Sequence, residues 1–170
     1  MTKKTLLCAC VGGLMGLMTS CGAKAQMPEG KLLRLEYRRS GSMAGFEYFG
    51  RVTTMKDSTI VLYAMRQEMG PLYRVNVDAR AMDRLCEIIK EEKMYKYKPH
   101  YDPPVQVLDG YTWLFSAEFA GNQSIYSGGS NALPGGDGLE RIRDLFKELV
   151  KSDAAEEIPA EDSWNIMLDR

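Results

Sequence analysis

The sequence contains little histidine, few cysteines outside its first residues, and no run of basic residues. One histidine, His100, excludes a histidine-rich metal site and most catalysis that relies on several histidines. The 22 Lys and Arg nearly balance the 23 Asp and Glu, for a formal net charge of −1. Without a basic patch, this balance argues against a nucleic-acid partner. We therefore expect no metal, no other cofactor and no catalytic residue of a familiar type.

The first 20 residues have the layout of a secretory signal peptide. Lys3 and Lys4 provide a short positive region, and an uncharged stretch of apolar and small residues follows over 6–18. Three of the four cysteines, Cys8, Cys10 and Cys21, lie in or beside this segment. Removal of residues 1–20 leaves Cys86 as the only cysteine in the body, so the exported domain must rely on its core instead of disulfides.

Two processing sites compete at the end of this segment. Leu-Met-Thr-Ser-Cys over 17–21 resembles the lipobox of bacterial lipoproteins, although Met18 replaces the usual Leu, Val or Ile. That resemblance implies that Cys21 carries acyl chains such as palmitate and anchors the protein to a membrane, facing the periplasm. Alternatively, Ala-Lys-Ala over 23–25 is an A-x-A site whose cleavage releases a soluble periplasmic or secreted protein beginning at Gln26.

The sequence after residue 20 is predicted to consist of a linker, one domain and a tail. Residues 21–30 are small and polar, residues 31–152 carry the periodic patterns of a folded domain, and residues 153–170 are acidic. Trp164, Ile166 and Leu168 suggest that the end of this tail docks on the domain.

Alternating apolar and polar residues predict strands near 31–38, 46–53, 73–77 and 111–119. Residues 59–65 are apolar on both faces and predict a central strand, and Gly121-Asn122 predicts a hairpin into a short strand around Ile125. Helical spacing predicts one helix after an Asp78 N-cap and another after Asp137, where Glu140 completes a capping box. The order ββββ-α-ββ-α predicts an α+β fold, in which an antiparallel sheet of about six strands carries two helices on one face. On the polar face, we expect Arg34, Arg38, Arg51 and Arg74 to form solvated charge pairs with Glu36 and Glu47.

Aromatic residues and the histidine gather around the long loop between the first helix and the fifth strand. Exposed aromatic rings stack on sugars or on partner side chains, which makes this loop a candidate binding region. The alternative is that the rings pack the loop onto the sheet. The candidate residues are Tyr95, Tyr97, His100, Tyr101, Tyr111 and Trp113.

Two further features have weaker chemical interpretations. Ser130 with His100 and Asp102 or Asp109 would supply the residues of a serine hydrolase, but their order and spacing do not match a nucleophile elbow. The glycine-rich stretch 128–136 precedes a helix, but it lacks a P-loop ending and is better read as a tight connection. Cys86 lies on an apolar helical stripe, as a small core residue would.

The segments Asp109–Trp113 and Ser127–Pro134 resemble small exported envelope proteins of Gram-negative bacteria whose function is unknown. The resemblance implies an envelope location and no particular activity. We therefore expect a non-enzymatic envelope lipoprotein that binds a protein or glycan partner. The alternatives are a hydrolase based on Ser130 and His100, and a structural subunit of an envelope complex.

Overall fold

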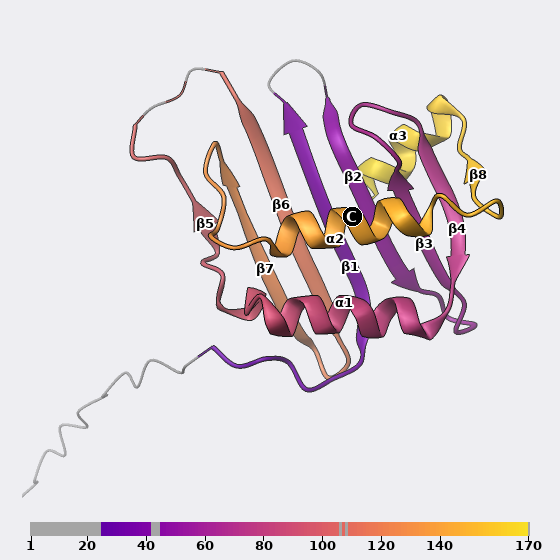
Figure 1. Ribbon diagram of the computed structural model, residues 1–170, viewed down its shortest axis with the longest axis horizontal. Coiled ribbons are helices and arrows are strands. Elements are labelled where there is room, and N and C mark those ends of the chain that lie inside the picture. Colours follow the sequence, from indigo (N-terminus) through magenta and orange to yellow (C-terminus); the bar gives the residue numbers. More distant parts are fainter. Residues whose placement is uncertain (1–24, 42–44, 106, 108, 170) are drawn as a thin grey trace, which may run out of the picture.

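The computed structural model describes residues 25–41, 45–105, 107 and 109–169. It confirms the α+β class, with a mixed, mostly antiparallel sheet in the order β5-β7-β6-β1-β2-β3-β4-β8 (Figure 1). The strands are β1 (Leu32–Gly41), β2 (Phe46–Thr54), β3 (Ile60–Met65), β4 (Leu72–Val77), β5 (His100–Tyr101), β6 (Tyr111–Phe119), β7 (Gln123–Ser130) and β8 (Glu156–Glu157). The helices are α1 (Ala79–Glu91), α2 (Gly138–Leu149) and α3 (Ala160–Leu168), and a 3₁₀ turn spans Met94–Lys96.

The sheet contains all six predicted strands and two short ones at its edges. β1 to β4 form the expected antiparallel meander, and the β6–β7 hairpin pairs with the free side of β1. β5 pairs with β7 in parallel, and β8 pairs with β4. Each edge strand has two residues, which is too short for an alternating pattern to reveal.

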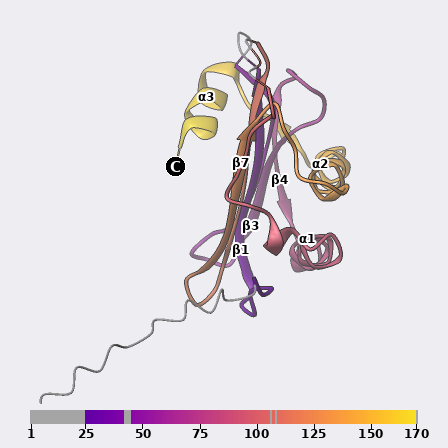
Figure 2. The same cartoon turned by 90° about the vertical axis from the view of Figure 1, so that its left-hand side faces the viewer.

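Helices α1 and α2 cover one face of the sheet, as predicted (Figure 2). Between them and the sheet lies a core that includes Leu35, Leu62, Leu85 and Ile142, all fully buried. Gly50 permits this approach at the centre of β2, because a Cβ there would lie 2.3 Å from Cδ2 of Phe146 on α2. A larger residue at this point would push the helix away from the sheet.

The two predicted helix starts differ in outcome. Asp78 caps α1 as expected, and its carboxylate accepts a hydrogen bond from the Ala81 amide at 3.3 Å. The capping box predicted for α2 is wrong, because Asp137 makes no side-chain capping bond. Glu140 forms an ion pair with Arg143 one turn later instead of turning back to the helix start.

The C-terminal segment crosses to the opposite face of the sheet. After β8, residues 160–168 form α3, which lies on the face that α1 and α2 leave uncovered (Figure 2). Trp164 packs beside Phe46 with ring centroids 6.1 Å apart, and Met167 is buried in the core cluster. This short helix covers part of the second face of the sheet, and a partly enclosed space lies beside it.

Candidate functional site

A cleft of about 490 Å³ lies between α3 and the β3–β4 turn. Such a volume falls within the range of about 300–1,000 Å³ that is usual for ligand sites. Its walls come from three separate parts of the chain: the start of β2, the end of β3 with the turn into β4, and the segment from β8 through α3. The lining residues are Phe46, Met65, Met69, Gly70, Pro71, Leu72, Glu157, Ile158, Pro159, Ala160, Ser163, Trp164 and Met167.

The cleft is chemically suited to an apolar group. Its two polar side chains already have partners, because the Ser163 hydroxyl donates back to the Pro159 carbonyl at 3.0 Å and Glu157 accepts from the Tyr73 hydroxyl at 3.0 Å. Apolar surface nonetheless stays open to solvent, since Met69 is 65% exposed and Trp164 is 50% exposed. Adjacent large apolar groups that remain exposed are characteristic of binding surfaces.

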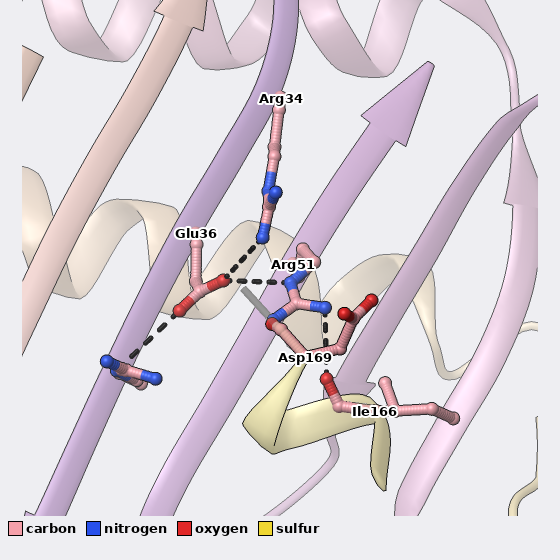
Figure 3. Close-up of polar contacts among 6 residues, drawn as sticks. Arg34, Glu36, Arg51, Ile166 and Asp169 are labelled. Atoms are coloured by element: carbon pink, nitrogen blue, oxygen red, sulfur yellow. Dashed lines mark hydrogen bonds and ion pairs between the residues drawn. The ribbon is translucent and has the colours of Figure 1, made fainter. Parts of the chain in front are cut away.

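A buried ion pair holds α3 over the sheet (Figure 3). Glu36 on β1 and Arg51 on β2 are register partners, with Arg51 Nε 2.8 Å from Glu36 Oε2 and both side chains nearly inaccessible. The same guanidinium donates to the carbonyls of Ile166 at 3.0 Å and Asp169 at 2.6 Å, at the C-terminal end of α3. A cation at this end of a helix satisfies free carbonyls and interacts favourably with the helix dipole.

This arrangement corrects the expectation of a fully solvated charged face. Glu36 and Arg51 are 5% and 6% exposed because α3 covers them. Arg34 and Arg38 flank Glu36 at 3.4 and 3.6 Å and are partly accessible, whereas Glu47 forms its ion pair with Arg39. The alternating pattern located these side chains on the strands, but it could not show that a distant helix would bury two of them.

Several of the predicted aromatic residues face inward. Trp113 is 4% exposed, and its indole Nε1 donates to the Ala132 carbonyl at 2.7 Å. Tyr101 lies 5.9 Å from the Trp113 ring and 6.4 Å from the half-buried Tyr97, between ring centroids. Tyr97 in turn packs edge-on against Phe115 at 6.4 Å. These rings attach the loop to the sheet, as the alternative interpretation proposed.

The other candidate residues near this loop remain at least partly exposed. Tyr95 is half-buried beside Lys96, whose Nζ lies 5.7 Å from the ring centroid. Tyr111 is half-buried under Arg39, whose guanidinium carbon lies 4.8 Å from its ring centroid. His100 is exposed. Binding by this region stays a prediction.

The structure places the hydrolase residues near one edge of the sheet without linking them into a triad. His100 Nε2 lies 2.9 Å from Asp102 Oδ1, and both side chains are largely exposed. His100 is the register partner of Gly128, two residues before Ser130 in β7. Within the described part of the chain, no hydrogen bond joins Ser130 to His100, and the hydrolase alternative stays a prediction.

Other expectations concern Cys86 and the glycine-rich stretch. Cys86 is a free thiol that is only half-buried, and this burial raises its pKa, which disfavours the reactive thiolate. Gly128 and Gly129 belong to β7, where a Cβ at Gly129 would lie 2.3 Å from the Tyr101 carbonyl oxygen. The close pairing of β5 with β7 thus explains a glycine at position 129.

The remaining expectations concern metals and the membrane. Among residues 25–41, 45–105, 107 and 109–169, no group of three or more His, Cys, Asp or Glu is placed to hold a metal ion. No helix in this described portion has both the length and the apolarity needed to cross a bilayer. Cys21 and the rest of the predicted signal peptide lie outside the described residues.

Sequence reasoning missed the cleft because its residues lie far apart in the chain. The available signal was the recurrence of Trp164, Met167 and Leu168 at helical spacing after Pro159, in a segment interpreted as an acidic tail. Comparison with known proteins adds no assignment, since no protein-family model and no curated protein matches this chain.

Proposed function

We propose that this protein is an exported, lipid-anchored envelope protein that binds a partner protein without catalysis. The observation that carries the binding proposal is the open apolar cleft under α3, which has exposed Met69 and Trp164 at its mouth. An apolar side chain of a partner would gain about 25 cal/mol for each Å² of apolar surface that it removes from water. Binding there requires no reacting group.

The anchor proposal rests on the lipobox-like residues 17–21 and on Cys21 as the acylated residue. Two acyl signals hold a protein on a membrane without a transmembrane helix. Incorporation of radiolabelled palmitate into the wild-type protein and its loss in Cys21→Ala would support this anchor. A wild-type protein that incorporates no palmitate would contradict it.

The cleft is tested with an apolar fluorescent probe, N-phenyl-1-naphthylamine, added to the exported Cys21→Ser protein. We expect the probe to brighten with this protein and to lose most of its signal when Ala160→Phe fills the cleft. Asn165→Phe is the matched control, because Asn165 is an exposed residue of α3 that does not line the cleft. Equal probe signal from both variants would refute the cleft as the binding site.

A further inference from the structure

The chain that forms one side of the cleft carries charge of a single sign. Between Ser152 and Asp169 the sequence contains no Lys or Arg. One of its acidic residues, Glu157, lines the cleft directly, and Glu161 and Asp162 lie in the first turn of α3. The acidic residues of this segment are Asp153, Glu156, Glu157, Glu161, Asp162 and Asp169.

These carboxylates are exposed and are not neutralised within the described chain. None of the six forms an ion pair with another described residue, whereas acids elsewhere such as Glu92 and Glu148 are paired with arginines. Arg74 is the Cα register partner of Glu156, yet no ion pair forms between their side chains. The cations beneath α3 are already paired: Arg51 is occupied by Glu36 and by two helix carbonyls, and Arg34 and Arg38 also lie against the Glu36 carboxylate.

We infer that the cleft accepts a cationic peptide segment of a partner protein that carries an apolar side chain. This inference rests on the proposed binding function and adds the chemistry of the partner. The apolar side chain enters the space between Met69 and Trp164, and flanking Lys or Arg side chains meet Glu157 in the cleft and Glu161 and Asp162 on the adjoining first turn of α3. Complementary charge of this kind accelerates encounter and rejects acidic partners.

The acidic rim, formed by Glu157, Glu161 and Asp162, also disfavours an anionic membrane surface as the occupant of the cleft. Exposed apolar residues such as Trp164 and Leu168 could enter a lipid headgroup layer, but the carboxylates on the same helix would be repelled by anionic lipids. A basic peptide satisfies the apolar and the charged features together. Vesicles of phosphatidylglycerol and phosphatidylethanolamine provide the corresponding control in the test.

The test uses three fluorescently labelled six-residue peptides with a central Phe-Leu pair flanked on each side by two lysines, two serines or two glutamates. Fluorescence anisotropy with the exported Cys21→Ser protein measures the Kd of each. We expect the order lysine, serine, glutamate from tightest to weakest. Neutralising the rim with Glu157→Gln, Glu161→Gln and Asp162→Asn should weaken the lysine peptide by at least about threefold, given about 0.2–1 kcal/mol for each exposed charge pair.

The outcomes separate this inference from the proposed function. If all three peptides bind equally and Ala160→Phe abolishes binding, the cleft binds partners but the cationic preference is refuted. If no peptide binds, or if Ala160→Phe changes nothing, the proposed function fails as well. Binding to the anionic vesicles in preference to the lysine peptide would overturn the assignment of a peptide partner. Higher salt should weaken the lysine peptide in the parent protein and have less effect in the neutralised variant.

Discussion

Arg51 is the residue whose removal tests most directly how α3 is held. Its guanidinium makes three hydrogen bonds, to Glu36 and to the carbonyls of Ile166 and Asp169. Arg51→Met keeps much of the apolar stem but leaves Glu36 buried and the end of α3 without its cation. Breaking a buried ion pair from one side costs about 3–5 kcal/mol when the remaining charge is uncompensated.

The structure reduces that figure, because two other arginines stay near Glu36. Arg34 and Arg38 lie 3.4 and 3.6 Å from its carboxylate, and both are partly exposed. We therefore expect Arg51→Met to lower the free energy of unfolding by about 2–4 kcal/mol, out of roughly 5–15 kcal/mol for a typical domain. In a domain of this size, the midpoint of thermal unfolding should fall by about 4–16 °C.

Urea unfolding followed by far-UV circular dichroism measures this loss. Arg74→Met is the matched control, because Arg74 is an exposed arginine of the same sheet face without an ion pair, and it should change stability by no more than about 0.5 kcal/mol. A double-mutant cycle with Glu36→Gln should give a coupling energy of about 1–3 kcal/mol. Arg51→Met as stable as Arg74→Met, or a coupling energy of zero, would refute the reasoning.

Three further predictions concern the core. Gly50→Ala should lose about 1–3 kcal/mol in urea unfolding because its Cβ would clash with Phe146, whereas Gly135→Ala, with open space around it, should be nearly neutral. Burial raises the pKa of Tyr37 from 10.0 to about 12. The contribution of its protonated hydroxyl to the free energy of unfolding is therefore complete below pH 10 and is lost as the pH rises through 12. Alkaline unfolding should therefore be shallower for Tyr37→Phe over that range, and an identical slope would contradict the assignment. Because burial raises the pKa of Cys86, iodoacetamide should label it in the native protein at pH 8 more slowly than in urea; equal rates would count against this protection.

The regular part of the fold could be predicted because it depends on local patterns. The alternation in β1, β2 and β4, the apolar run of β3 and the helical spacing after Asp78 depend on neighbouring residues, and these predictions are confirmed. The capping box at Asp137 was wrong because Glu140 and the Asp137 amide each have another partner, one on the same helix and one on a distant segment. Glu140 pairs with Arg143, and the Asp137 amide lies near Glu92 of another segment. The edge strands β5 and β8 were missed because two residues carry no periodic signal.

The candidate site was the least predictable feature. The aromatic loop was predicted as a binding region because its residues are close in sequence. The Trp113 ring instead packs beside Tyr101, and its indole donates to the Ala132 carbonyl between β7 and α2. The cleft requires Phe46, Pro71 and Trp164 to lie side by side. No local sequence pattern indicates that these distant residues come together. Burial of Glu36 with Arg51 likewise depends on a helix more than 100 positions later in the sequence.

Methionine methyl groups provide the most direct measurement of the central claim, that the cleft under α3 binds a basic, apolar peptide. Met65, Met69 and Met167 line the cleft, whereas Met55 and Met82 do not. In the exported Cys21→Ser protein labelled with ¹³C at the methionine methyls, titration with the lysine-flanked Phe-Leu peptide should shift the three cleft resonances and leave the other two in place. Shifts confined to Met55 or Met82, or none at saturating peptide, would contradict the account.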